Sequence, residues 1–238
     1  MNAQHPLAGQ TALITGASRG IGLAIARKLG TMGAQLALCA RHAGRLEQAE
    51  AELRQAGCRT LAVPADVTDA AAVDALVQKV IGTLGGIDIL VNNAGVGIFA
   101  PLHELCEDDW DRVMNTNLKG VYLCSRAVAP QMMRRHSGHI INISSLAGKN
   151  AFAKGGVCAS KWGLQGMTAC MAEDLRGYGI RVSAVCPGTV ETEFSPHAGK
   201  DPKKMLQPED VAHVVAMLLT QAEQSFVSEV ELRPTQKP

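Results

Sequence analysis

The sequence has 238 residues and a formal net charge of +1, with 23 lysine and arginine residues against 22 aspartate and glutamate residues. A chain of this length is typical of one α/β domain, and its balanced charge argues against nucleic-acid or anionic-membrane partners. Its start shows no basic segment followed by an apolar run, and no stretch is apolar for long enough to cross a bilayer. We therefore expect a cytoplasmic protein that binds no membrane.

Short aliphatic or β-branched runs alternate with longer helical patterns along the chain, which predicts a parallel sheet with helices on both faces. Seven runs are expected to form strands: Thr11–Thr15, Gln35–Ala40, Thr60–Val63, Ile87–Val91, His139–Ser144, Arg181–Val185 and Phe226–Leu232. The helical patterns between them begin near Ile21, Gly44, Ala70, Glu107, Val157 and Pro208. Each pattern is long enough for a right-handed crossover between parallel strands.

No linker, repeat or change of composition divides the chain, so residues 1–238 are expected to form a single-domain, doubly wound Rossmann fold of the α/β class. The least regular segment is Thr189–Gln207, which follows a late strand. Because ligands of such folds bind beyond the carboxyl ends of the strands, this segment is expected to be a lid. The seven cysteines form no C-x-x-C pair, which indicates reduced thiols, most of them in the core, and no metal site.

A glycine-rich stretch, TGASRGIG, follows the first predicted strand and runs directly into a helix. Glycines let the backbone turn tightly and approach a pyrophosphate, while the start of the helix supplies N–H donors. The position between strand and helix favours a dinucleotide site over an ordinary turn. The cofactor contacts expected in this stretch are Gly16, Ser18, Arg19, Gly20, Ile21 and Gly22.

The residues after the second strand bear on which dinucleotide is bound. In folds that bind NAD, an acidic residue at this place accepts a hydrogen bond from the ribose 2′-hydroxyl. Ala40 stands there instead, and Arg41 follows it. Arg41, together with Arg19 of the glycine-rich stretch, would pair with a 2′-phosphate, which favours NADP over NAD as the cofactor. Each arginine taken alone is more often a solvated surface residue.

Further motifs follow in order: NNAG at Asn92–Gly95, NTNLKG at Asn115–Gly120, NISS at Asn142–Ser145 and CPGTVET at Cys186–Thr192. With TGASRGIG before them, in this order and at this spacing, they make the chain resemble the short-chain dehydrogenase/reductase family over essentially its full length. The overall pattern is most similar to the 3-oxoacyl-acyl-carrier-protein reductase type. The resemblance implies a Rossmann enzyme that moves hydride between NAD(P)H and a small-molecule carbonyl or alcohol, and that forms a homodimer or homotetramer.

The resemblance implies catalytic roles for Asn117, Ser145 and Lys161. It also implies that Asn92 steadies the central strand beside the cofactor and that Thr192 contacts the nicotinamide carboxamide. Taken singly, Asn117 would also fit a helix brace, Ser145 a strand end and Lys161 a surface lysine. The cofactor contacts that the resemblance adds are Asp66, Val67, Asn93, Ala94, Gly95, Lys161, Pro187, Gly188, Val190 and Thr192.

One residue of the family pattern is missing. Family members carry a tyrosine four residues before the lysine, and one helical turn puts the phenol on the same face as the ammonium, which favours the phenolate. That tyrosine gives a proton to the carbonyl oxygen as hydride arrives. Position 157 is Val157, which cannot transfer a proton, and the short side chain of Cys158 stands only three residues before Lys161. We expect Cys158 to pack beneath the helix, and Tyr122 and Tyr178 to be packing residues elsewhere.

The spacing indicates that a residue has been lost and not substituted. In the family the serine precedes the lysine by about seventeen residues, the last four of which make one helical turn. Here Lys161 follows Ser145 by sixteen. One tyrosine between Val157 and Cys158 would restore both family spacings. Either this residue was deleted, or it is present in modified form and missing from the printed sequence.

Three functions from different classes follow from these features. The first is an NADP(H)-dependent carbonyl reductase or alcohol dehydrogenase with an apolar substrate pocket. The second is an NADP(H)-binding sensor or scaffold that has lost turnover. The third is a structural role in an oligomer, because Met-rich apolar stripes on two of the helices would pack across a symmetric interface. The residues expected to line the pocket, beside the lid, are Ile98, Phe99, Phe152 and Phe194.

Overall fold

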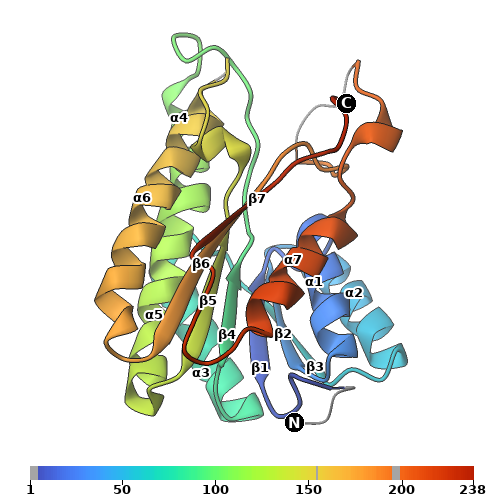
Figure 1. Ribbon diagram of the computed structural model, residues 1–238, viewed down its shortest axis with the longest axis vertical. Helices are drawn as coiled ribbons and strands as arrows, with labels where there is room; N and C mark the ends of the chain where they lie inside the picture. Colours follow the sequence, from blue (N-terminus) through green and yellow to red (C-terminus); the bar gives the residue numbers. More distant parts are fainter. Residues whose placement is uncertain (1–4, 154, 195–198) are drawn as a thin grey trace.

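In the computed structural model, the described residues are 5–153, 155–194 and 199–238. They form a seven-stranded sheet in the order β3-β2-β1-β4-β5-β6-β7, with every pair of neighbouring strands parallel (Figure 1). The predicted doubly wound α/β fold is confirmed. The strands are β1 Thr11–Thr15, β2 Gln35–Ala40, β3 Thr60–Pro64, β4 Ile89–Asn92, β5 Gly138–Ile143, β6 Ile180–Pro187 and β7 Glu229–Leu232.

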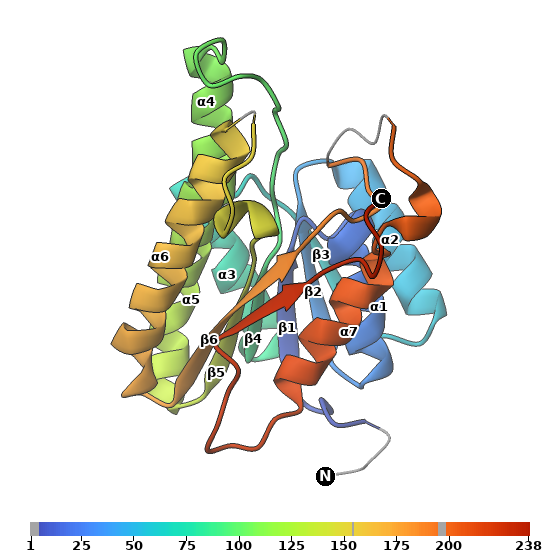
Figure 2. The same ribbon diagram turned by 45° about the horizontal axis from the view of Figure 1, so that its top comes forward.

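Helices cover both faces of this sheet (Figures 1 and 2). Those on one face are α1 Gly20–Thr31, α2 Ala43–Gln55 and α7 Pro208–Leu219. Those on the other face are α3 Ala70–Leu84, α4 Glu107–Met114, α5 Gly120–Arg135 and α6 Gly156–Arg176. Because successive side chains of a strand point to opposite faces, Leu13 packs with the core beneath α3 and α5, and Ile14 packs with the core beneath α1 and α7. Helices therefore close both faces, and ligands can reach the sheet only at its ends.

One helix predicted to begin near Glu107 is a run of three segments. The eight-residue α4 passes into a π-helix, Asn115–Lys119, which continues directly into α5. The apolar pattern of a helix does not reveal a π turn, because one wider turn changes the periodicity by only one residue. Short π segments often occur at functional sites, and this one carries Asn117.

Two strands begin later than predicted because side chains take the backbone groups of their expected first residues. The backbone of Ile87 bonds to the side chains of Gln131 and Arg135, so β4 begins only at Ile89. The backbone of Val227 bonds to the side chains of Gln221 and Ser183, so β7 begins at Glu229 and not at Phe226. The other strand ends lie within a residue or two of their predicted positions.

The cysteines lie in more varied places than predicted. All seven are free, but only Cys39, Cys124 and Cys186 are buried. Cys58 and Cys158 are half-buried, and Cys106 and Cys170 are exposed. The expectation that most cysteines are core residues is therefore wrong. Among the described residues, no helix has the length and apolar character needed to span a membrane.

His139 of β5 is buried beside Ser183 of β6, with 2.8 Å between its Nε2 atom and the serine Oγ atom. Burial, together with the charge of Arg181, lowers the pKa of His139 to about 3. In the unfolded chain a histidine titrates at about 6.5. Between these two values the unfolded state binds a proton that the folded state does not, so the free energy of unfolding must fall as the pH falls below 6.5.

We predict that His139→Gln removes this part of the pH dependence, which amounts to about 1.4 kcal/mol per pH unit at most. Urea denaturation at several pH values between about 5 and 7.5 measures it. His213→Gln, the same substitution at an exposed position, is the control. Equal slopes for the wild type and His139→Gln would contradict the assignment.

Candidate active site

The carboxyl ends of the strands open into one cavity of about 1260 Å³. All but two of the site residues predicted from the sequence line it, whereas Gly22 and Asn117 lie behind its wall. The predicted residues in the wall are Gly16, Ser18, Arg19, Gly20, Ile21, Arg41, Asp66, Val67, Asn93, Ala94, Gly95, Ser145, Lys161, Pro187, Gly188, Val190 and Thr192. Residues that are far apart in the sequence are therefore brought to a single site.

The glycine-rich stretch forms a close-fitting turn between β1 and α1. Gly16 and Gly20 have positive φ angles of 66° and 55°, which residues other than glycine rarely adopt. A Cβ atom on Gly16 would lie 2.9 Å from the Cα atom of Ala94, and one on Gly22 would meet the Gly16 carbonyl. A Cβ atom on Gly20 would find only Thr192, at 3.5 Å. Gly16 and Gly22 thus permit tight packing, while Gly20 leaves backbone open to the cavity, as a pyrophosphate site requires.

The NNAG segment after β4 holds this turn in place. The side-chain nitrogen of Asn93 donates to the carbonyls of Thr15 and Gly16 at 3.0 and 3.2 Å. The backbone N–H groups of Asn93 and Ala94 both donate to the Thr15 hydroxyl at 3.0 Å. The side chain of Asn93 therefore supports the glycine-rich turn, and these hydrogen bonds hold Asn93 in the cavity wall.

Asn92 ties the central strand to its neighbours. Its side-chain nitrogen donates to Asn142 Oδ1 of β5 at 2.9 Å and to Ser125 Oγ of α5 at 3.1 Å. The side chain of Asn142 in turn donates to Thr168 Oγ1 of α6 at 2.9 Å. Buried polar side chains that are paired in this way fix the relative positions of strands and helices beneath the cavity floor.

β2 contributes no carboxylate to the cavity wall at its carboxyl end. β2 ends at Ala40, and Arg41 follows it in the cavity wall. Asp66 lies nearby, but its Oδ1 atom accepts hydrogen bonds from the N–H and the hydroxyl of Thr68 at 2.9 and 2.8 Å. The charge available to a ligand from the residue after β2 is therefore positive.

Asn117 is fully buried in the π-helix and braces the loop after β4. Its Oδ1 atom accepts from the N–H of Val96 at 2.8 Å, and its Nδ2 atom donates to the Val96 carbonyl at 3.0 Å. The same nitrogen donates to Ser160 Oγ at 3.2 Å, which joins the π-helix to α6. The contacts of Asn117 are thus those of a brace, the alternative that the sequence left open for this residue. Ser160 was missed from the sequence, where its only signal was its place beside Lys161.

Lys161 is buried in α6, with 5% of its surface exposed, and lines the cavity. Its ammonium donates to the carbonyl of Ile143, at the end of β5, at 2.8 Å. Burial lowers the pKa of Lys161 to about 8, so the side chain is still mostly protonated at neutral pH. The alternative of a surface lysine is wrong.

Two serines lie at the end of β5 in the same wall. Ser145 does not end the strand: its hydroxyl accepts from the N–H of Ala147 at 3.0 Å and caps the short 3-10 helix Leu146–Gly148. It also donates to the Pro187 carbonyl at 3.5 Å, a long hydrogen bond that a better acceptor would replace. The hydroxyl of Ser144 is buried and has no partner among the described residues.

No tyrosine reaches this site. Both tyrosines of the sequence, Tyr122 and Tyr178, lie outside the cavity wall with 48% and 39% of their surface exposed, so the expectation that they are packed is wrong. Val157 occupies the cavity wall one helical turn before Lys161 and is buried. Cys158 also lines the cavity and is half-buried, so it does not pack beneath the helix as expected. The place beside Lys161 where an acid is expected holds an apolar side chain.

The predicted lid, Thr189–Gln207, is described except for residues 195–198, which lie outside the described part of the chain. Its first part closes over the cavity, where the ring of Phe194 meets that of Phe99 edge to face with 6.2 Å between centroids. Ile98 and Phe152 line the same cavity. This segment therefore adds apolar surface to the cavity.

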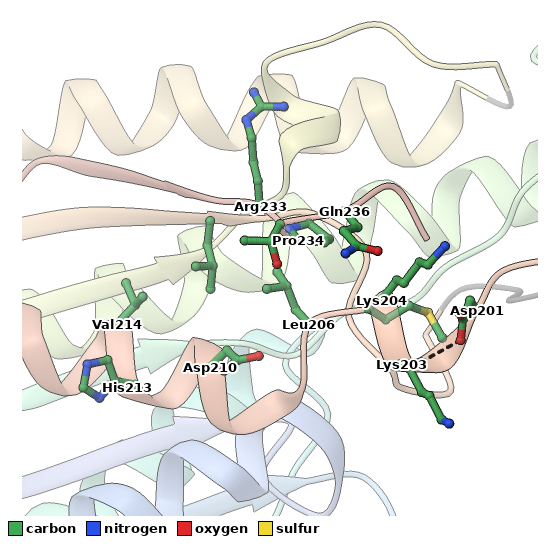
Figure 3. Close-up of a pocket in the computed structure, with 13 residues that line it drawn as sticks. Asp201, Lys203, Lys204, Leu206, Asp210, His213, Val214, Arg233, Pro234 and Gln236 are labelled. Atoms are coloured by element: carbon green, nitrogen blue, oxygen red, sulfur yellow. Dashed lines mark hydrogen bonds between the residues drawn. The ribbon is translucent and has the colours of Figure 1, made fainter.

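The end of the chain also contributes to the site, which no motif indicated. Residues 233–238 follow β7 and line the large cavity. Some of them share a second hollow of about 570 Å³ with α7 and the 3-10 helix Pro202–Lys204 (Figure 3). In that hollow Asp201 accepts from the N–H of Lys203. Arg233, which also lines the hollow, pairs with Glu231 of β7 at 2.6 Å.

Residues 10–203 match the family model described as short chain dehydrogenase. The chain belongs to the short-chain dehydrogenase family. A curated relative, the sepiapterin reductase of Chlorobaculum tepidum, is 39% identical over 94% of this chain and 95% of its own. The 3-oxoacyl-acyl-carrier-protein reductase of Staphylococcus aureus is 38% identical over 88% of this chain and 90% of its own.

Two solved structures of short-chain dehydrogenase relatives resemble the whole chain. A metagenomic short-chain oxidoreductase in complex with NADP has 47% sequence identity and a TM-score of 0.86, covering 98% of this chain and all of its own. An alcohol dehydrogenase from the archaeon Thermococcus sibiricus, complexed with 5-hydroxy-NADP, has 34% identity and a TM-score of 0.89, covering 96% of this chain and 98% of its own.

We predict that Asn117→Ala lowers the free energy of unfolding by about 1–3 kcal/mol, because it leaves the backbone N–H and carbonyl of Val96 without their partner. Urea denaturation monitored by circular dichroism measures the change. Asn150→Ala is the matched control: Asn150 is exposed and its side chain makes one hydrogen bond, of 3.3 Å, among the described residues, so its loss should amount to less than about 0.5 kcal/mol. Equal effects of the two substitutions would disprove the bracing role.

Proposed function

We propose that the protein is an NADP(H)-dependent oxidoreductase that transfers hydride between the nicotinamide and a carbonyl or alcohol substrate. The observation that carries this proposal is the single cavity, which has a glycine turn at one end and Ser145 and Lys161 at the other. Its volume of about 1260 Å³ is large enough for a dinucleotide's reactive half together with a small substrate. Self-association as a homodimer or homotetramer remains a prediction.

The preference for NADP(H) over NAD(H) rests on the charge beside β2. Ala40 leaves no carboxylate for a ribose hydroxyl, and Arg41 and Arg19 line that end of the cavity. Arginine pairs with a phosphate through two parallel hydrogen bonds. The two solved relatives described above, which are complexes with NADP and 5-hydroxy-NADP, support the same choice.

When bound, the cofactor supplies the hydride. In this proposal the Ser145 hydroxyl donates to the substrate oxygen, exchanging its long bond to the Pro187 carbonyl for a stronger one. The Lys161 ammonium, fixed by the carbonyl of Ile143, stabilises negative charge that develops on that oxygen. Asn117 acts from behind the wall, by holding the Val96 segment and α6 in position.

The proton that must reach the substrate oxygen has no ordinary donor, since Val157 stands where a tyrosine is expected. General acid catalysis contributes about 10²–10⁴-fold to such reactions. We therefore propose that a protein with this 238-residue sequence reduces carbonyls slowly. The second candidate, an NADP(H)-binding sensor or scaffold without turnover, is favoured by the same observation: the cofactor wall is complete and the acid is absent.

The substrate is proposed to be an apolar carbonyl compound, and the 3-oxoacyl type that the Staphylococcus aureus relative's name describes is one candidate. Support comes from four apolar side chains that line the same cavity as Ser145 and Lys161, namely Ile98, Phe99, Phe152 and Phe194. Burial of such a substrate against these side chains is favourable by about 25 cal/mol for each Å² of apolar surface removed from water.

The proposal is tested by comparing NADPH binding with NADPH consumption in one protein sample. We expect saturable binding by NADPH fluorescence, tighter than that of NADH, and slow consumption with a panel of reactive ketones. Failure to bind NADPH would refute the proposed function. Binding with no consumption of NADPH by any ketone would favour the sensor.

The intact mass of the same sample is the control, and we expect it to equal that of the 238-residue sequence. A mass heavier by one tyrosine, modified or not, would mean that the active site is complete. In that case fast ketone reduction is expected.

A further inference from the structure

Glu193, in the described part of the lid, lines the cavity beside the glycine turn. Its carboxylate forms an ion pair with the guanidinium of Arg19, in the glycine turn. It also lies 4.0 Å from the guanidinium of Arg45, in the first turn of α2. One acidic side chain of the lid therefore meets two arginines that belong to the nucleotide end of the fold.

The position of these arginines indicates what else they would bind. In doubly wound folds the adenosine ribose lies beyond the end of β2, beside the glycine turn. Arg19 belongs to that turn, and Arg45 follows β2 by five residues. A carboxylate and a phosphate both accept paired hydrogen bonds from a guanidinium, so the Glu193 carboxylate occupies donors that a 2′-phosphate requires.

Thr192, the residue before Glu193, also lies against the glycine turn. The methyl group of Thr192 lies 3.5 Å from the position that a Cβ atom on Gly20 would have. Arg41, by contrast, makes no ion pair among the described residues, although it lines the same end of the cavity. An incoming phosphate can therefore meet Arg41 freely, but must compete with Glu193 for Arg19, which lines the cavity. Arg45 lies just outside the lining and 4.0 Å from the same carboxylate.

We propose that Glu193 is a specificity-determining residue for the cofactor, whose carboxylate competes with the 2′-phosphate of NADP(H) for Arg19 and Arg45. NAD(H) has no such phosphate and leaves the ion pairs in place. Glu193 therefore weakens NADP(H) binding selectively and reduces the preference that the arginines create. This inference rests on the proposed function, because it assumes that the cavity takes a nicotinamide dinucleotide.

The effect is modest because the partners are open to solvent: the side chains of Arg19 and Glu193 are 52% and 70% exposed. Exposed ion pairs of this kind change an equilibrium by about two- to fivefold, and salt screens them. The competition between Glu193 and the phosphate is therefore identified by a change in the binding of ligands that carry a 2′-phosphate and not of those that lack it.

The test compares Glu193→Gln with Glu191→Gln. Glu191 belongs to the same loop and the same cavity wall, but its carboxylate accepts from the side chain of Gln207 at 2.9 Å and makes no ion pair with an arginine among the described residues. Both variants remove one negative charge from the lid. Only Glu193→Gln frees Arg19 and Arg45.

Dissociation constants are measured for NADPH and NADH by fluorescence, and for adenosine 2′,5′-bisphosphate and adenosine 5′-monophosphate by calorimetry, at low and at high salt. For Glu193→Gln we expect the two ligands with a 2′-phosphate to bind about two- to fivefold more tightly at low salt, with a smaller gain at high salt and no change for the other two. Glu191→Gln removes the same charge but frees no arginine, so it should not alter the ratio between the dissociation constants of ligands with and without a 2′-phosphate.

Equal gains for NADPH and NADH in Glu193→Gln, no gain, or weaker NADPH binding would each overturn the competition. These outcomes differ from a failure of the proposed function, in which the wild-type protein binds neither NADPH nor adenosine 2′,5′-bisphosphate. In that case the inference fails with the function on which it rests.

Discussion

The parallel pairing of the central strands is the constraint on which the site depends. Because β1, β4, β5 and β6 run in one direction, the residues that follow them meet at one edge of the sheet. The glycine turn follows β1, the NNAG segment follows β4 and Ser145 follows β5. The hydrogen bond from Lys161 to the Ile143 carbonyl then fixes α6 against this edge. Both faces of the sheet are closed by helices, so this edge is where a ligand can enter.

Much of this arrangement could be predicted from the sequence, because the signals are local. Alternating aliphatic runs and helical patterns predict a doubly wound sheet, and a glycine-rich turn between strand and helix predicts where a dinucleotide lies. Ser145 and Lys161 could be assigned because the motifs around them resemble those of the family. The spacing between them, sixteen residues, predicts that one residue has been lost, and this stays a prediction; both side chains line the cavity.

The features that could not be predicted depend on contacts between distant segments. The buried partner of Asn117 is Ser160, 43 residues further along the chain. The ion pair of Glu193 with Arg19 and the approach of residues 233–238 to the cavity follow from the paths of a loop and a chain end that carry no motif. The late starts of β4 and β7 have the same origin, since side chains from elsewhere take their backbone groups.

We propose that the cofactor cavity is complete and lacks only a proton donor beside Lys161. The most direct test is the rate of ketone reduction by Val157→Tyr, which places a phenol one helical turn before Lys161, with Val157→Phe as a control of equal bulk. We expect Val157→Tyr to reduce ketones about 10²–10⁴-fold faster than the wild type at unchanged NADPH affinity, and Val157→Phe to show no such gain. A wild type as fast as Val157→Tyr, or a folded, NADPH-binding Val157→Tyr that is no faster than Val157→Phe, would contradict it.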